Sequence, residues 1–228
     1  MTLRPLVTAS ALALLTALSA CASGNKHSES LKRADDIVTR IERVHVECEL
    51  AKERSHEALG WLQSLVTGDF EGDALSAYTG FVEAVEASEK QAEVLRDAVE
   101  PMDSSAEKFF HGWETDLNSF ANPKMRRRSQ TKLTQSRQRY QSIETAVEPA
   151  LSAYDAFNLG MSDIVLFLSH DFNAASDLKR EVRSLMRLSK ELDQGFAQTL
   201  QAAQNYIQTS ALPAGVQMTI ENEGQDQD

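Results

Sequence analysis

The densest cluster of like charges in the chain lies near its middle and could contact an anionic surface. It comprises Lys124, Arg126, Arg127, Arg128 and Lys132, and Arg137 and Arg139 follow it. A basic side chain beside an anionic lipid surface is worth about 1 kcal/mol, so this cluster could contact phospholipid headgroups or a partner protein. In the alternative interpretation it pairs with Glu114, Asp116 and acidic residues earlier in the chain, which would add little stability. The net charge of −11 argues against a general nucleic-acid binder.

Two short motifs match half of a carboxylate-bridged di-iron site, in which glutamate and histidine side chains from facing helices hold the metals. These motifs are Glu42-x-x-His45 and Glu53-x-x-His56. Both fall on one predicted helix and mostly off its apolar face, which favours solvated side chains over metal ligands. His111 and Glu114 also share a helix face, but no second histidine or cysteine follows at metal-ligand spacing.

No other arrangement of catalytic residues is visible in the sequence. It contains no glycine-rich phosphate loop, no serine nucleophile elbow and no cysteine–histidine pairing. We therefore predict no catalytic residue, no metal, no nucleotide and no other cofactor, and we interpret the protein as non-enzymatic.

The first 20 residues have the pattern of a secretory signal peptide. Arg4 supplies a positive charge, residues 6–18 are mostly apolar, and Leu18-Ser19-Ala20-Cys21 closes the segment. The apolar run is too short to span a membrane. Its closing residues resemble the bacterial lipobox, which predicts a lipidated Cys21 at the start of the mature chain. The alternative is an ordinary signal peptide cleaved near Ala20 or Ala22, which would leave Cys21 as a free thiol.

The residue after Cys21 bears on location. It is Ala22 and not aspartate, which by resemblance to sorting signals favours the periplasmic face of the outer membrane. Cys48 is the only other cysteine, so no disulfide is expected if Cys21 carries lipid. Cys48 falls on an apolar helix face, which favours a small buried core residue over a redox thiol. Trp61 and Trp113 are likewise interpreted as packing residues.

Long helices must position all of these residues. The chain has only 10 glycines and 5 prolines in 228 residues, which is typical of an all-helical protein. Apolar residues recur in alternating steps of three and four from Tyr78 to Phe120 and from Leu133 to Leu168. This period predicts helices that pack lengthwise in coiled-coil fashion. Asn122-Pro123 separates the two runs and must end the first of these helices.

Four helices are predicted, over residues 28–66, 73–121, 124–169 and from a tight turn at 170–173 to 210. Ser28 and Asp73 are the expected N-caps. Short loops make consecutive helices antiparallel, so the predicted fold class is all-α: an elongated antiparallel bundle with coiled-coil packing and up-down-up-down topology. The inner two helices are expected to be the longest and to be kinked at Pro101 and Pro149.

The predicted domain organisation follows from these limits. Residues 1–20 are the signal peptide, 21–27 a tether after lipidated Cys21, 28–210 a single bundle domain and 211–228 a disordered acidic tail. Since the first helix starts at the lipidated end, the tip at Asn122-Pro123 should point toward the membrane together with the basic cluster.

Two blocks of the sequence resemble a known family. The first is Phe110-x-x-Trp113-Glu114, with Asn122, Arg127-x-Ser129, Leu133 and Arg139-Tyr140; the second is Val165-Leu166-Phe167-Leu168-x-His170-x-Phe172-Asn173-Ala174. Together they resemble the bacterial lipoproteins classed as domain of unknown function 2959, over most of the mature chain. That family has no established activity, so the resemblance assigns no catalytic residue.

The sequence therefore predicts a lipid-anchored, periplasm-facing scaffold or adaptor of the bacterial cell envelope. Its expected partners are the membrane, reached through the lipid anchor, and an envelope protein or a second copy of the chain. An alternative is a binding module that holds a lipid or another hydrophobic ligand within the kinked bundle. A metalloenzyme is a third, less supported possibility.

Overall fold

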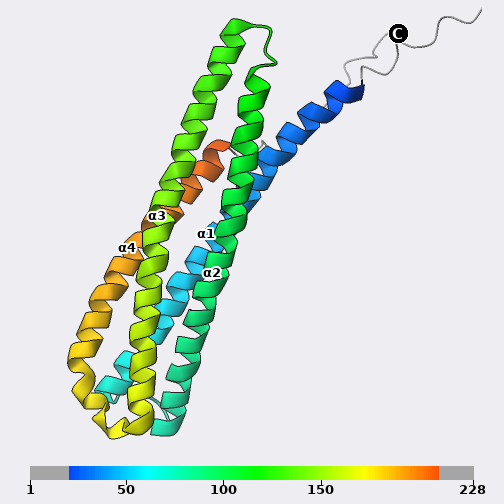
Figure 1. Cartoon of the computed structure of the whole chain (residues 1–228). Coiled ribbons are helices and arrows are strands. Elements are labelled where there is room, and N and C mark those ends of the chain that lie inside the picture. The colour runs from blue at the N-terminus through cyan, green and yellow to red at the C-terminus, as the bar shows by residue number, and fades with distance from the viewer. Residues whose placement is uncertain (1–20, 211–228) are drawn as a thin grey trace, which may run out of the picture.

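The structure, a computed structural model, describes residues 21–210, with side chains from residue 28 onward, and contains four long helices (Figure 1). They are α1 (Cys21–Thr67), α2 (Ala74–Leu117), α3 (Pro123–His170) and α4 (Lys179–Ser210), with a short 3-10 helix η1 (Phe172–Leu178) before α4. The described residues contain no strand. The all-α fold class is confirmed.

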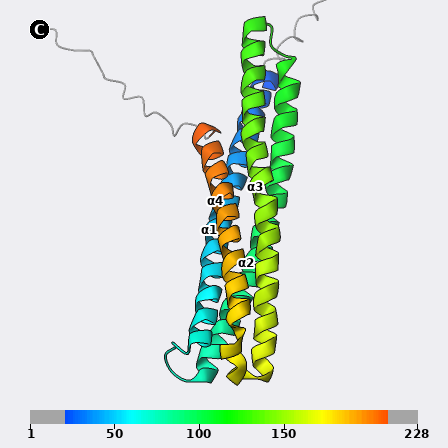
Figure 2. The same cartoon turned by 90° about the vertical axis from the view of Figure 1, so that its left-hand side faces the viewer.

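The helices form an up-down-up-down bundle in which each helix packs beside its neighbours in the chain. α1 also packs against α4, which closes the bundle, whereas α2 and α4 lie on opposite sides. The turn between α2 and α3 lies at the same end of the rod as the start of α1, and the other two connections lie at the far end (Figures 1 and 2). The predicted topology is therefore confirmed.

Helix α1 begins earlier than the sequence predicts. It starts at Cys21, so residues 21–27 continue the helix, and Ser28 is not its N-cap. Extending an existing helix adds one hydrogen bond for each residue that is fixed, and no proline interrupts this stretch. As a result α1 has 47 residues and α2 has 44, so the expectation that both inner helices are longest is wrong for α2 and holds for α3, with 48.

The apolar residues of the two inner helices form the centre of the bundle. Along α2 the buried set includes Phe81, Val85, Ala92, Leu95, Val99, Met102 and Ala106. Along α3 it includes Leu133, Tyr140, Ile143, Val147, Ala150, Tyr154, Phe157, Met161, Ile164 and Leu168. One predicted member is wrong: Phe120 is exposed, because α2 ends at Leu117 and not near Ala121.

The helix ends follow the local sequence. Asp73 caps α2 by accepting a hydrogen bond from the backbone N–H of Ser76, after Gly68 and Gly72 turn the chain with positive φ. Asn122 caps α3 by accepting from the N–H groups of Lys124 and Met125, with Pro123 in the first turn.

Both internal prolines lie within continuous helices. α2 continues through Pro101 and α3 through Pro149, and the apolar period runs on without a shift, with Val99, Met102 and Ala106 all buried. The prolines therefore do not end either helix. The kinks themselves stay a prediction.

The start of α4 also differs from expectation. The sequence predicts that the fourth helix follows directly after a tight turn at residues 170–173. Instead Asp171 caps η1, its side chain accepting from the N–H of Asn173, and the chain makes this short helix before α4 begins at Lys179.

Helices α3 and α4 approach closely at Gly195. A Cβ at this position would lie 3.1 Å from the Cβ of Ala150 and 3.2 Å from its Cα, which is tight for contact with a backbone. Gly60 in α1 is the opposite case, because nothing lies within 4 Å of a Cβ built there. Substituting alanine at Gly60 therefore tests helix propensity alone, whereas substituting it at Gly195 also tests the packing of α3 against α4.

We expect Gly195→Ala to lower the free energy of unfolding by about 1 kcal/mol, because overpacking costs more than the gain in helix propensity. Gly60→Ala should raise it by about 1 kcal/mol through propensity alone. Urea denaturation followed by circular dichroism measures both changes. Stabilisation of equal size by the two variants would show that α3 and α4 are not in close contact at this level.

Candidate membrane-facing surface

The first turns of α3 carry an exposed basic surface at the end of the hairpin that α2 and α3 form. We call it the basic tip, and it consists of Lys124, Arg126, Arg127, Arg128 and Lys132. All five side chains are exposed. The structure thus brings together the five residues that the sequence predicts as a headgroup or partner contact.

No side chain of the basic tip forms an ion pair with another described residue. Arg126 donates a hydrogen bond to the amide oxygen of Asn118, at 3.1 Å, which is a neutral partner. The nearby carboxylates are engaged elsewhere. Glu114 pairs with Arg137 at 2.7 Å, and this bond lowers the pKa of Glu114. Asp116 lies 3.7 Å from Arg33 and accepts a hydrogen bond from Ser30 at 2.8 Å.

The alternative, in which Glu114 and Asp116 pair with this basic stretch, therefore holds for Arg137, which follows the cluster, but not for the five residues of the basic tip. The basic partners of those two carboxylates are Arg137 and Arg33, and neither belongs to the basic tip. The charge of the tip is therefore available to an anion from outside the described bundle.

The position of the basic tip on its helix also favours an external anion. The N-terminus of a helix carries a partial positive charge, so cations in the first turn destabilise it by roughly 0.3–1 kcal/mol each. The first turn of α3 contains no acidic residue. Residues 123–143 hold seven basic side chains and no acidic one, in a chain whose net charge is −11. An anion bound here would face both the side-chain charges and the helix end.

The hairpin end is stiffened by contacts between α2 and α3 just below the basic tip. The indole N–H of Trp113 donates to Ser129 at 2.8 Å, and the ring packs edge-on against Phe109. Arg137 lies 5.2 Å from the centre of the Phe110 ring. Trp61 and Trp113 both pack against the core, which confirms their interpretation as packing residues.

Helix α4 ends at Ser210, short of the first turns of α3, so the hairpin of α2 and α3 projects past it (Figure 2). The last aromatic contact between α3 and α4 places the Tyr206 hydroxyl 3.2 Å from Ser136. Residues 123–132 of α3 lie beyond this contact, and all of them are exposed except Ser129, which is half-buried.

Helix α1 reaches the same end of the rod and is held there by α2. Arg33 lies across Gly112, where an added Cβ would come within 2.6 Å of the Arg33 Nε. Together with the Ser30–Asp116 hydrogen bond, this contact holds α1 against the end of α2 at residues 30–33, whereas the first turns of α1 point away from α2 (Figure 1). Cys21 lies nine residues before Ser30, or about 13 Å of helix. The predicted lipidation site and the basic tip thus share one end of the rod (Figure 1).

The motifs considered as metal sites are not brought together. His56 contacts Asp193 of α4 at 2.7 Å, while Glu42, Glu53 and His111 are exposed. Among the side chains that the structure describes, no three His, Cys, Asp or Glu residues are placed to hold a metal ion.

Two hollows lie on the described surface, each between two neighbouring helices. One of about 390 Å³ lies between α2 and α3, and its lining includes Asp103, Glu107, His111 and Glu144. Asp103 accepts a hydrogen bond from Tyr140, and burial together with this carboxylate raises the pKa of Tyr140. The other, of about 880 Å³, lies between α3 and α4 and is lined by Gln, Asn, Ser, Thr and Ala side chains. Both hollows are open to solvent and expose apolar as well as polar surface, so neither is an enclosed apolar cavity.

Sequence reasoning missed the buried polar contacts that connect the helices. Ser88 of α2 donates to the amide oxygen of Asn158 of α3 at 2.6 Å, and its hydroxyl lies 3.1 Å from the Tyr154 hydroxyl. Glu47 of α1 is only 3% exposed and accepts from Gln91 of α2 at 2.7 Å. The sequence signal that could have indicated such contacts is a polar residue at a position of the apolar period, where the side chain is buried, as at Ser88.

The fold defines the class of this protein as an elongated antiparallel four-helix bundle. The family model described as "Protein of unknown function (DUF2959)" matches residues 26–210, and the chain belongs to this family. The resemblance to this family that was drawn from the sequence is thereby confirmed, whereas the lipoprotein character stays a prediction. No curated protein and no solved structure matches the chain. Within residues 21–210, no helix has a stretch long and apolar enough to cross a bilayer.

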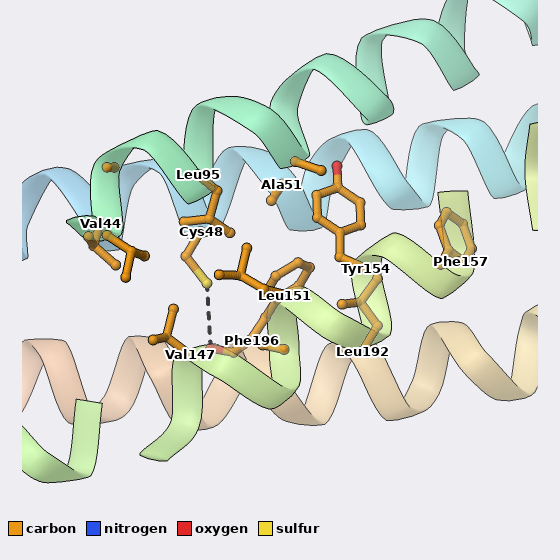
Figure 3. Close-up of a cluster of buried hydrophobic side chains, with 14 of the residues drawn as sticks. Val44, Cys48, Ala51, Leu95, Val147, Leu151, Tyr154, Phe157, Leu192 and Phe196 are labelled. Carbon is orange, nitrogen blue, oxygen red and sulfur yellow. Dashed lines mark hydrogen bonds between the residues drawn. The ribbon is translucent and has the colours of Figure 1, made fainter. Parts of the chain in front are cut away.

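Cys48 lies in the centre of the bundle among apolar side chains of all four helices (Figure 3). It has no exposed surface, and its Sγ is 3.9 Å from the backbone oxygen of Phe196. Burial raises the pKa of this thiol to about 12. The prediction of a small buried core residue is confirmed.

We expect the Cys48 thiol of the Cys21→Ser variant to react with Ellman's reagent only after unfolding, because the reactive thiolate is disfavoured in the core. The reaction at pH 8 should be slow in buffer and complete in denaturant. Since the folded pKa is raised, stability should also fall as pH rises from about 9 toward 12. Fast labelling of the folded variant would contradict the buried position.

Proposed function

We propose that this protein is a lipid-anchored, non-enzymatic scaffold or adaptor on the periplasmic face of the outer membrane. Acyl chains on Cys21 would hold one end of the rod in the membrane, and the basic tip would rest on anionic phospholipid headgroups beside them. The observation that carries this proposal is the unpaired basic tip at the end of the rod where α1 begins at Cys21.

Two attachments at one end would orient the rod as well as retain it. Lipid chains contribute about 0.8 kcal/mol per buried methylene, so several chains make an effectively permanent anchor. An anchor alone leaves the tilt of the rod free. A second contact through five cations, at about 1 kcal/mol each, would favour one orientation of the bundle over the membrane.

The rest of the rod supports a role in contacting a partner. α3 has 48 residues and is about 70 Å long at 1.5 Å per residue. The interior of the bundle is filled by apolar side chains. Its charged outer surface offers a long face to an envelope protein or to a second copy of the chain. The alternative of a hydrophobic ligand held inside the bundle is less well supported, because the two hollows described above are open at the surface and do not enclose a cavity between the helices.

The lipid anchor is tested by replacing Cys21. In cells, Cys21→Ser should abolish incorporation of labelled palmitate and move the protein out of the outer-membrane fraction. Cys48→Ser is the matched control and should keep both properties, because it removes the other cysteine of the chain. Palmitate incorporation that survives in Cys21→Ser would remove the basis of the proposal.

The membrane contact of the basic tip is tested on the Cys21→Ser background, where no acyl chain can mask it. Changing Lys124, Arg126, Arg127, Arg128 and Lys132 to Gln should reduce co-sedimentation with vesicles of phosphatidylethanolamine and phosphatidylglycerol at least tenfold. The reason is the loss of about 1 kcal/mol for each cation near an anionic surface.

A charge-matched control is available at the far end of the rod. Changing the five exposed cations Lys179, Arg180, Arg183, Arg187 and Lys190 of α4 to Gln removes the same charge and should leave vesicle binding nearly unchanged. Equal losses in the two variants would mean that net charge, and not the basic tip, determines binding.

A further inference from the structure

The basic tip lacks an ion-pair partner among the described residues, and the chain itself contains a segment of opposite charge in the sequence after α4. Residues 221–228 carry four carboxylates: Glu221, Glu223, Asp226 and Asp228. Residues 211–228 contain no basic side chain, and residues 211–220 contain no charged side chain at all. The sequence after α4 is therefore a neutral spacer of ten residues followed by an acidic segment.

The end of α4 places this acidic segment within reach of the basic tip. Tyr206 lies beside Ser136, and the two helices run antiparallel, so Ser210 is roughly level with Lys132. Lys124 lies about 12 Å further along α3, and neighbouring helix axes are about 10 Å apart. The span from Ser210 to the far side of the tip is therefore about 16 Å.

The length of the spacer matches this span. Ten residues reach at most about 33 Å when extended. The root-mean-square length of a flexible chain of ten residues is about 17 Å. A linker whose average length equals the distance to be bridged gives the highest effective concentration, in the millimolar range. By contrast, Lys190 lies twenty residues down α4 from Ser210, or about 30 Å away, beyond the average reach of the spacer.

We propose that the acidic segment 221–228 binds the basic tip of the same chain. Four carboxylates would face five cations and the positive end of α3 within the Debye length of about 10 Å at 0.1 M salt, so the attraction would be strong at low salt and screened at high salt. The segment would occupy the same surface as anionic headgroups and would compete with them. This second statement rests on the proposed function, whereas binding of the segment to the tip does not.

The contact is tested with a carbodiimide, a zero-length reagent that joins an amine to a carboxylate. Within the basic tip the amines belong to Lys124 and Lys132. Treatment of the purified full chain followed by mass spectrometry should give peptides that link these two lysines to residues 221–228. The yield should fall several-fold at high salt and in the Arg126→Gln, Arg127→Gln, Arg128→Gln triple variant.

Two controls make this result decisive. Lys179 and Lys190 are exposed on α4 far from the tip, beyond the average reach of the spacer, and should give far fewer links. A mixture of heavy-isotope and ordinary protein should show links within one chain and not between chains. Links to Lys179 and Lys190 in equal yield, or links only between chains, would overturn the proposal.

The competition with headgroups is tested separately on the Cys21→Ser chain. Changing Glu221 and Glu223 to Gln and Asp226 and Asp228 to Asn should increase binding to phosphatidylglycerol vesicles several-fold. If this variant binds vesicles no better than its parent, while the parent chain gives the expected links, the competition alone is overturned. If neutralising the basic tip leaves vesicle binding intact, while the chain with an unchanged tip still gives the links, the membrane role fails and the internal contact stands.

Discussion

The register between four long helices is the constraint on which this structure depends. Burial of the apolar period on every helix holds the bundle together but alone permits slippage by one heptad, or about 10 Å. Polar contacts oppose such a slip. Ser88 with Asn158 fixes α2 against α3, Glu47 with Gln91 fixes α1 against α2, and Tyr206 with Ser136 fixes α4 against α3. The coincidence of the basic tip with the start of α1 follows from this alignment.

Much of the fold could be predicted from the sequence, because its signals are local or periodic. The alternating apolar steps give the helices and their buried faces, and Asn122-Pro123 gives the central turn. The errors concern where helices begin and end, which the apolar period does not determine. α1 begins at Cys21 since nothing in residues 21–27 stops a helix, and η1 precedes α4 through a capping contact at Asp171 that no period encodes.

The basic tip could be located from the sequence but its electrostatic state could not. A run of arginines can be seen in the sequence. The basic partner of each nearby carboxylate, however, depends on how α1, α2 and α3 are placed in space. Glu114 pairs with Arg137, and Asp116 with Arg33 of α1, which lies more than eighty residues away in the sequence. Only this assignment shows that the residues of the tip have no ion-pair partner in the described bundle.

The early end of α4 at Ser210 has a mechanical consequence. The resistance of a rod to bending rises steeply with its thickness. The bundle has four helices side by side over most of its length but fewer at the end that carries the basic tip (Figure 2). A sideways force on the far end would bend the molecule first in this thin section. The four-helix part of the rod would then keep its shape while its angle to the basic tip changes.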